Sequence, residues 1–330
     1  MSRILLICFV SPKIGLGHLS RMLTLASSLN DKRDIIPEFL IFGELVKKNE
    51  LTKYKVHNFP LENNFVNTIE IILNQANFNA LVFDLYKNCK IKKLGLLFKK
   101  LKKIEIFTVA IDSLIEHCNI LDLIWIPSFY FDCSKYQDCN SIIKSGWDSF
   151  LIDKRLNHKS WKPGLKVLIL TGGSDLANLG QTLPNQLDQS LADGSEINWV
   201  KGPFSKKPNL PNKCRLNWVI HDAPEHLDEL IVNSNYVISV FGVSFFEVLQ
   251  YGIPTVVFSP YKKDNQELNV LSKENVALVA DNIEESISGL SKLMNNEKIS
   301  KKYSVNALKK MSSRGTDKLS NKILSHIKLK

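Results

Sequence analysis

The stretch Ile14-Gly15-Leu16-Gly17-His18-Leu19-Ser20-Arg21 constrains the fold more than any other part of this 330-residue chain. It follows an apolar run, residues 4–10, that predicts a buried strand. It precedes residues 19–29, whose apolar side chains recur at helical spacing. The stretch is therefore expected to connect a strand to a helix, at the strand end where ligands bind in open α/β sheets.

The residue types in this loop suit an anionic ligand. Gly15 and Gly17 let the backbone turn tightly and approach a ligand closely. The helix N-terminus behind them offers N–H groups and a partial positive charge. His18 adds a side chain that titrates near neutrality. The alternative is a plain glycine turn with an exposed histidine. The loop has neither the third glycine of a dinucleotide fingerprint nor the Gly-Lys-Ser/Thr of a Walker loop.

Strand-like and helix-like segments alternate along the whole chain, which predicts doubly wound parallel sheets. The length suggests two domains. Gly146, Trp161 and Pro163 interrupt the alternation, so we expect an α/β chain with two Rossmann-like domains, residues 1–160 and 161–330, facing a cleft. The expected strands are residues 4–10, 35–42, 54–58, 80–83, 104–111 and 121–126, then 167–170, 196–200, 215–220, 236–240, 255–258 and 277–279.

Polar residues follow several strands of the first half. Asp84 and Tyr86 end one strand, and Asp112 ends the next. Because the carboxyl ends of parallel strands share one sheet edge, these residues are expected near His18, with His117 a further candidate. Each of them alone could be a turn residue or a helix cap, as Asp112 before Ser113 illustrates.

Two glycine turns mark the second half. Residues 172–174 and 242–244 each lie between a predicted strand and a predicted helix, where backbone N–H groups suit a diphosphate. Glu247 follows Ser244 by three residues and is expected to accept hydrogen bonds from a ribose diol. The alternative is a capping box formed by the same serine and glutamate. The two interpretations are compatible.

The charge and composition of the chain limit the classes of molecule that it is expected to bind. The net charge of +10 favours an acidic partner, and no nucleic-acid-binding signature accompanies it. Part of the excess lies in a basic amphipathic helix expected over residues 91–103, which is either solvated or weakly attached to a membrane surface. No apolar run is long enough for a membrane helix, and the first apolar run is expected to be a strand rather than a signal peptide. The oligomeric state stays open.

The six cysteines form no CxxC pair, so reduced thiols of a cytoplasmic protein are expected rather than a disulfide frame or a zinc site. No Asp-x-Asp pair ends a strand either. We therefore expect neither a metal nor a cofactor.

The motifs, taken in order, resemble those of the UDP-sugar hydrolase of pseudaminic acid synthesis and its relatives in spore-coat polysaccharide synthesis. The matching segments are residues 15–21, 83–86, 111–118, 146–155, 172–179, 242–247, 252–254 and 264–266. The chain departs from the family pattern at residues 8–13, which lack an Arg-x-Asp, and at Phe241 and Val243. The resemblance implies the GT-B fold of nucleotide-sugar enzymes.

The resemblance also assigns roles. His18 corresponds to the catalytic histidine and Tyr86 to an active-site tyrosine, and Asp84 is expected to act beside them. Nucleotide-sugar contacts correspond to Ser244, Glu247, Asn265 and Gln266. The remaining residues expected to bind substrate are Gly15, Gly17, Arg21, Asp112, Gly173, Ser174, Gly242 and Val243.

Three functions follow from this resemblance. The first is hydrolysis of a UDP-amino-sugar in surface polysaccharide synthesis. The second is glycosyl transfer from a UDP-sugar to an acceptor hydroxyl. The third is a sugar-nucleotide-binding protein without activity. The retention of His18 and Tyr86 speaks against the third, and the sequence does not separate the first two.

Overall fold

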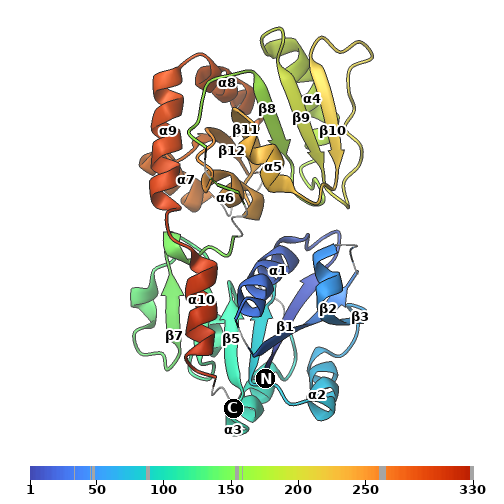
Figure 1. Cartoon of the computed structure of the whole chain (residues 1–330), viewed down its shortest axis with the longest axis vertical. Helices are drawn as coiled ribbons and strands as arrows, with labels where there is room; N and C mark the ends of the chain where they lie inside the picture. The colour runs from blue at the N-terminus through green and yellow to red at the C-terminus, as the bar shows by residue number, and fades with distance from the viewer. Residues whose placement is uncertain are drawn as a thin grey trace. The chain divides into compact units, whose positions relative to one another are not determined.

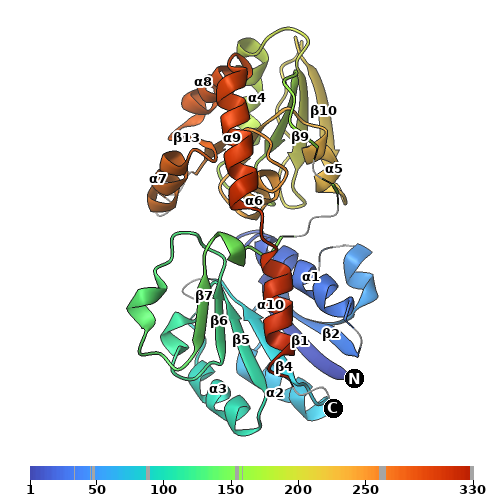
Figure 2. The ribbon, with the colours of Figure 1, turned by 60° about the vertical axis from the view of Figure 1, so that its left-hand side comes forward.

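The computed structural model describes residues 1–32, 34–44, 46, 49–86, 90–152, 156–157, 159–259 and 265–327. The chain divides into two compact units. Unit 1 comprises Met1–Ile152 together with Arg314–Lys330, and unit 2 comprises Asp153–Ser313. Figures 1 and 2 show a parallel sheet flanked by helices in each unit.

Unit 1 is built on a seven-stranded sheet with the order β3-β2-β1-β4-β5-β6-β7, and every neighbouring pair is parallel. The chain order reverses between β1 and β4, which is where ligands bind in such sheets. The strands are β1 (Ser2–Val10), β2 (Ile35–Gly43), β3 (Lys55–Phe59), β4 (Ala80–Asp84), β5 (Phe107–Ile111), β6 (Leu123–Ile126) and β7 (Ile142–Ser145).

Helices cover both faces of this sheet. α2 (Phe65–Gln75) and α3 (Leu94–Lys103) share one apolar core with alternate residues of β1, among them Leu5 and Ile7. α1 (Gly17–Asn30) and α10 (Gly315–Leu324) pack together (Figure 2). With helices on both sides, every residue of β1 after Arg3 is buried, which explains the unbroken apolar run in the sequence.

The sequence places the domain boundary near residue 160 and all of residues 161–330 in the second domain. The structure differs in one element, because α10 joins unit 1. The Ser28 and Ser320 hydroxyls of α1 and α10 are 2.9 Å apart, and Leu319 and Ile323 are fully buried. A local pattern predicts that this segment is a helix, but it carries no information about which sheet the helix covers.

β7 and a disulfide correct two expectations. Residues 142–145 are not among the expected strands, and they form the edge strand β7. Cys118 and Cys139 form a disulfide across 21 residues, so the expectation that all cysteines are reduced is wrong for this pair. Closing a loop of this length stabilises a fold by about 3 kcal/mol in the chain-entropy treatment. The thiols of Cys8, Cys133 and Cys214 are free, and Cys89 lies outside the described residues.

Unit 2 repeats the same plan with six parallel strands in the order β10-β9-β8-β11-β12-β13. Its switch point lies between β8 and β11. The strands are β8 (Lys166–Leu170), β9 (Glu196–Lys201), β10 (Asn217–Asp222), β11 (Tyr236–Val240), β12 (Thr255–Phe258) and β13 (Leu278–Ala280).

Six helices accompany the described part of this sheet. They are α4 (Leu179–Ser190), α5 (Leu227–Val232), α6 (Val243–Leu249), α7 (Asn265–Glu274), α8 (Ile283–Met294) and α9 (Glu297–Lys310). One core joins β8, β9 and β11 to α4 and α8 and encloses Trp199 and Tyr236. The predicted alternation of strands and helices is thus confirmed in both units.

No helix in the described ranges is both long and apolar enough to span a bilayer.

Candidate functional site

The β1–α1 loop turns as tightly as its glycines predict. The Gly15 backbone is left-handed, with φ +82°, and its N–H donates to the Ser11 carbonyl at 2.7 Å. Leu16 is the N-cap of α1, and Gly17 is the first helical residue. His18 and Arg21 therefore lie one turn apart on the same side of α1, directly after β1.

These two side chains meet Asp84, which ends β4 on the other side of the switch point. Asp84 Oδ1 lies 2.7 Å from His18 Nδ1. Arg21 donates from Nε to Oδ2 at 2.8 Å and from Nη2 to Oδ1 at 2.7 Å, which clamps both oxygens of the carboxylate. Arg21 Nη1 also donates a hydrogen bond to Asp112 Oδ2 at 3.3 Å, which connects the end of β5 to the cluster. Three strand ends thus meet in one charged cluster.

Burial makes this cluster electrostatically strong. Asp84 is fully buried, and burial alone would raise its pKa. The charges of Arg21 and His18, together with their hydrogen bonds, outweigh burial and hold the Asp84 pKa below its ordinary value. Burial and the Asp84 charge raise the pKa of the Cys8 thiol, which lies opposite Asp84 in the sheet register. Asp84 is therefore a carboxylate at neutral pH, and Cys8 stays a thiol.

The Asp84 carboxylate determines which ring nitrogen of His18 carries the hydrogen. Asp84 accepts hydrogen bonds, so His18 presents Nδ1–H to it, and the lone pair of the neutral ring then sits on Nε2. No described residue forms a hydrogen bond with Nε2. This histidine–aspartate arrangement is suited to a general base, because the aspartate orients the ring and stabilises the imidazolium that proton transfer produces.

The other residues predicted near His18 take different roles. Tyr86 is exposed and packs edge-on against Phe9, with ring centroids 5.4 Å apart. Asp112 adopts the left-handed conformation, with φ +58°, and its N–H donates to Trp125. His117 packs against Phe98 of α3 and is not bonded to the cluster. Gly15 and Gly17 shape the loop, as predicted.

In unit 2, the turn after β8 has the backbone geometry that its glycines allow. Gly172 is left-handed, with φ +82°, and a Cβ there would meet nothing. A Cβ on Gly202 would lie 2.4 Å from the Gly173 carbonyl, so only glycine fits at 202. The carboxylate of Asp175 caps α4, because it accepts hydrogen bonds from the N–H groups of Leu179 and Gly180.

Two hydroxyls of this turn are buried and have no hydrogen-bond partner among the described residues. They are Thr171 Oγ1, at the end of β8, and Ser174 Oγ. Buried polar atoms are nearly always hydrogen-bonded, so an unsatisfied pair invites a polar ligand.

The second glycine turn, after β11, differs from its expected form. Gly242 is the N-cap of α6, and the helix begins at Val243. Ser244 therefore lies inside the first turn, and the alternative of a capping box starting at Ser244 is not realised. Glu247 is half-buried on the same helix. β8 and β11 are paired, so this turn and the Gly172-Gly173 turn end neighbouring strands.

Of the last two predicted contacts, Gln266 is exposed on α7. Asn265 begins that helix, and its side chain lies outside the described residues, as do residues 260–264.

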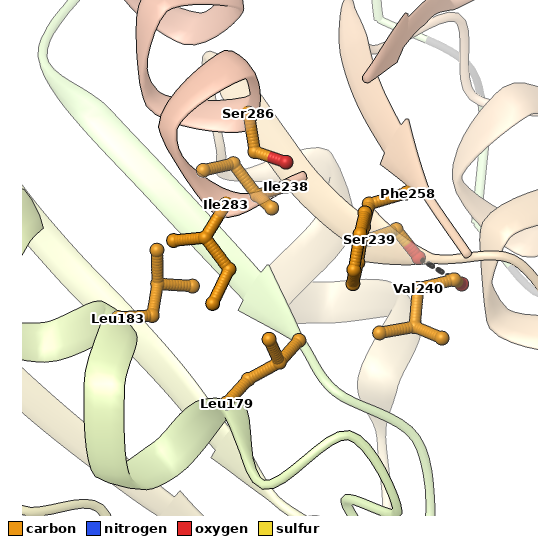
Figure 3. A pocket seen from close by; sticks show the side chains of 8 residues that line it. All are labelled: Leu179, Leu183, Ile238, Ser239, Val240, Phe258, Ile283 and Ser286. Carbon is orange, nitrogen blue, oxygen red and sulfur yellow. Dashed lines mark hydrogen bonds between the residues drawn. The ribbon is translucent and has the colours of Figure 1, made fainter. Parts of the chain in front are cut away.

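A small apolar hollow of about 10 Å³ lies beside the carboxyl ends of β11 and β12 (Figure 3). Leu179 and Leu183 of α4 line it, together with Val240, Phe258 and Ile283. Its two serines are satisfied by backbone carbonyls, so the hollow is a packing gap with room for about one water molecule.

Within the described ranges, no group of three or more His, Cys, Asp or Glu side chains is placed to hold a metal ion. The expectation that the reaction needs no metal stays a prediction.

Comparison with known proteins identifies the fold. MurG of Acinetobacter baumannii superposes with a TM-score of 0.66 at 14% identity, over 98% of this chain and 100% of that one. The glycosyltransferase of kitacinnamycin gives 0.67 at 12% identity, over 99% of both chains. The UDP complex of Staphylococcus aureus MnaA gives 0.61 at 12% identity, over 99% and 96%. This chain has the GT-B fold.

The likeness is confined to structure. No protein-family model matches the chain, and no curated protein matches it in sequence. The similarity to pseudaminic-acid hydrolases therefore stays a resemblance of motifs. The GT-B fold itself confirms the predicted architecture of two Rossmann-like domains.

The predictions treated Arg21 as a substrate-binding residue and did not connect it to Asp84. The structure gives Arg21 three hydrogen bonds within the cluster, two of them to Asp84 and one to Asp112. Cys8 was expected only as one of the reduced thiols, and not opposite Asp84. The spacing of three residues places His18 and Arg21 on one helix face, and this was the available sequence signal that Arg21 belongs to the cluster. The position of Cys8 opposite Asp84 depends on strand register, which the local sequence does not show.

Proposed function

We propose that this protein is a glycosyltransferase that moves a sugar from a UDP-sugar to an acceptor hydroxyl, with His18 as the general base. The observation that carries the proposal is the hydrogen bond from His18 Nδ1 to the buried Asp84 carboxylate. The GT-B fold supports it, because structures of this fold include transferases and a UDP complex.

In the proposed reaction, Nε2 of His18 takes the proton of the acceptor hydroxyl. The acceptor oxygen attacks the anomeric carbon of the sugar, and the bond between that carbon and the diphosphate oxygen breaks with its electron pair on UDP. Asp84 stabilises the imidazolium, and Arg21 holds Asp84 in place. Tyr86, which is exposed two residues after Asp84, is assigned to orient the sugar.

We assign the nucleotide to unit 2. The glycine turns at the ends of β8 and β11 offer N–H groups to the diphosphate, and the Thr171 and Ser174 hydroxyls complete its hydrogen bonding. Glu247 is assigned to the ribose diol, and the same site is proposed to include Gly173, Gly242, Val243, Ser244, Asn265 and Gln266. Neutral N–H groups then take the electrostatic role of a metal ion.

Hydrolysis of a UDP-amino-sugar is the second candidate, and the ordered motif set of the pseudaminic-acid hydrolases favours it. The chemistry at His18 is the same, with water in place of the acceptor. In both cases the protein would act in the cytoplasm, in the synthesis of a surface polysaccharide.

The experiment that separates the candidates is incubation of the purified protein with a panel of UDP-sugars, with and without acceptor mixtures. UDP release that depends strictly on acceptor supports the transferase. Release of free sugar without acceptor contradicts the transferase and supports the hydrolase. UDP binding without any turnover would indicate a sugar-nucleotide-binding protein and would overturn both the transferase and the hydrolase.

A further inference from the structure

The outer side of α3 carries a dense group of lysines, independent of the cluster around His18. We define the lysine face as the exposed side chains of residues 90–104. It consists of Lys90, Lys92, Lys93, Leu96, Lys99, Lys100, Lys102, Lys103 and Ile104.

The helix is fixed so that this face must point outward. Leu94, Leu97, Phe98 and Leu101 are buried in the core of unit 1. The Phe98 ring packs edge-on against Phe83, with centroids 5.2 Å apart. Rotation of α3 to hide the lysines would remove these side chains from the core. The lysine face is therefore a permanent surface feature of unit 1.

Little negative charge offsets the lysines. Lys100 pairs with Glu70 of α2 at 2.8 Å, and Glu105 follows the face directly. Residues 90–104 contain seven lysines and no acidic residue. Charges this close repel one another, and an anionic partner relieves that repulsion.

Two apolar side chains stand among these charges. Leu96 is 62% exposed and Ile104 is 54% exposed. On α3, Leu96 lies one turn from Lys99 and Lys100 and two turns from Lys103. A polyanion such as nucleic acid attracts the lysines but offers no apolar environment to the exposed leucine and isoleucine side chains. A lipid surface stabilises both, because anionic headgroups bind the lysines and the acyl boundary buries the apolar side chains.

We propose that the lysine face of α3 docks this protein reversibly on an anionic lipid surface. The docking is electrostatic with a small apolar contribution, so it is weak, reversible and sensitive to salt. It leaves the His18 cluster unchanged, since none of the residues involved contacts it. The inference stands whether the proposed transfer reaction holds or fails.

Co-sedimentation of the full-length protein with vesicles tests the proposal. Vesicles of equal parts phosphatidylcholine and phosphatidylglycerol should bind the protein at low salt, and vesicles of phosphatidylcholine alone should not. Each lysine removed should weaken binding about fivefold, so Lys99→Gln with Lys103→Gln should cost about 30-fold. Leu96→Gln should weaken binding several-fold, and Leu96→Trp should strengthen it.

α9 offers a matched control. Its residues Lys298 and Lys301 are also exposed, as is Val305 one turn after Lys301, but this helix carries Glu297 and lies in unit 2. Lys298→Gln with Lys301→Gln changes the net charge by the same amount and should leave vesicle binding within about twofold, because these lysines are not part of the lysine face. All substitutions are at exposed positions, and thermal melting confirms that each variant is folded.

Three outcomes overturn the proposal. The first is no binding to the anionic vesicles at low salt. The second is an equal loss of binding in the α9 control, which would show a general charge effect. The third is that RNA or heparin binds through the lysine face while vesicles do not. Unchanged UDP-sugar turnover in the lysine variants, combined with weaker vesicle binding, supports the proposal in full.

Discussion

Unit 1 and unit 2 share one sheet plan and differ in what they place at its switch point. In both units the chain order reverses between the first and fourth strands, β1 and β4 or β8 and β11. Unit 1 fills that position with the ion pair of Arg21 and Asp84 and with the imidazole of His18. Unit 2 fills it with two glycine turns and the unpartnered hydroxyls of Thr171 and Ser174.

The difference follows from what each edge can stabilise. A buried carboxylate requires opposite charge within hydrogen-bonding distance, and Arg21 provides it in unit 1. The turn after β8 has Asp175 as its nearest carboxylate, and that side chain caps α4. Its backbone N–H groups therefore carry the only positive potential that the described turn offers. One edge is suited to proton transfer and the other to holding an anion.

The sharpest test of this division is removal of the His18 imidazole. We expect His18→Ala to lower turnover about 10²–10⁴-fold, the usual effect of losing a general base. UDP affinity should stay near wild type, because the nucleotide is assigned to unit 2. Steady-state kinetics and calorimetry measure the two quantities. His326→Ala, an exposed histidine of the same unit, serves as the control and should keep full activity.

If folded His18→Ala turns over its true substrate normally, then unit 1 does not supply the base. A lowered melting temperature with normal turnover per folded molecule would instead give His18 a purely structural role.

The next largest effect concerns stability and pH. Asp84→Asn leaves Arg21 without its main partner and should destabilise the protein by roughly 3–5 kcal/mol at pH 7. The folded-state pKa of Asp84 is lowered, so its stabilisation is complete above the unfolded pKa of about 3.9 and is lost as pH falls through the folded value. The gap between wild type and variant in denaturant unfolding should therefore narrow below about pH 4.

The exposed pair of Lys201 and Asp222 in unit 2 is the matched control. Asp222→Asn should change stability by no more than about 1 kcal/mol. Equal effects of the two substitutions would remove the distinction between a charged edge in unit 1 and a neutral one in unit 2.

A smaller effect tests unit 2. Glu247→Ala should weaken UDP binding by about 1–3 kcal/mol, the cost of losing a charge-assisted hydrogen bond to the ribose. Glu267→Ala, on α7, gives a carboxylate control in the same unit. Unchanged UDP affinity by calorimetry would take Glu247 out of the nucleotide site.

The smallest expected effect is that of chelation. If backbone N–H groups replace a metal ion at the diphosphate, EDTA should leave turnover unchanged. The assay is turnover before and after dialysis against EDTA. Loss of activity that magnesium restores would show that unit 2 does not hold the diphosphate unaided.

The sequence alone determined the parts of this protein that depend on neighbours along the chain. Apolar periodicity and glycine positions are local properties, so the alternation of strands and helices, the β1–α1 loop and the strand-end positions of Asp84 and Asp112 could be predicted. The GT-B architecture followed from that alternation together with the order of the motifs.

Only the tertiary structure decided which of those residues meet and how. The clamp of Arg21 on Asp84 joins residues 63 positions apart, and the position of Cys8 opposite Asp84 depends on strand register. The return of α10 to unit 1 and the Cys118–Cys139 disulfide also join distant segments. The physical reason is common to all four: a periodic pattern fixes which side of an element is apolar, whereas the partner on that side is chosen by packing the whole chain.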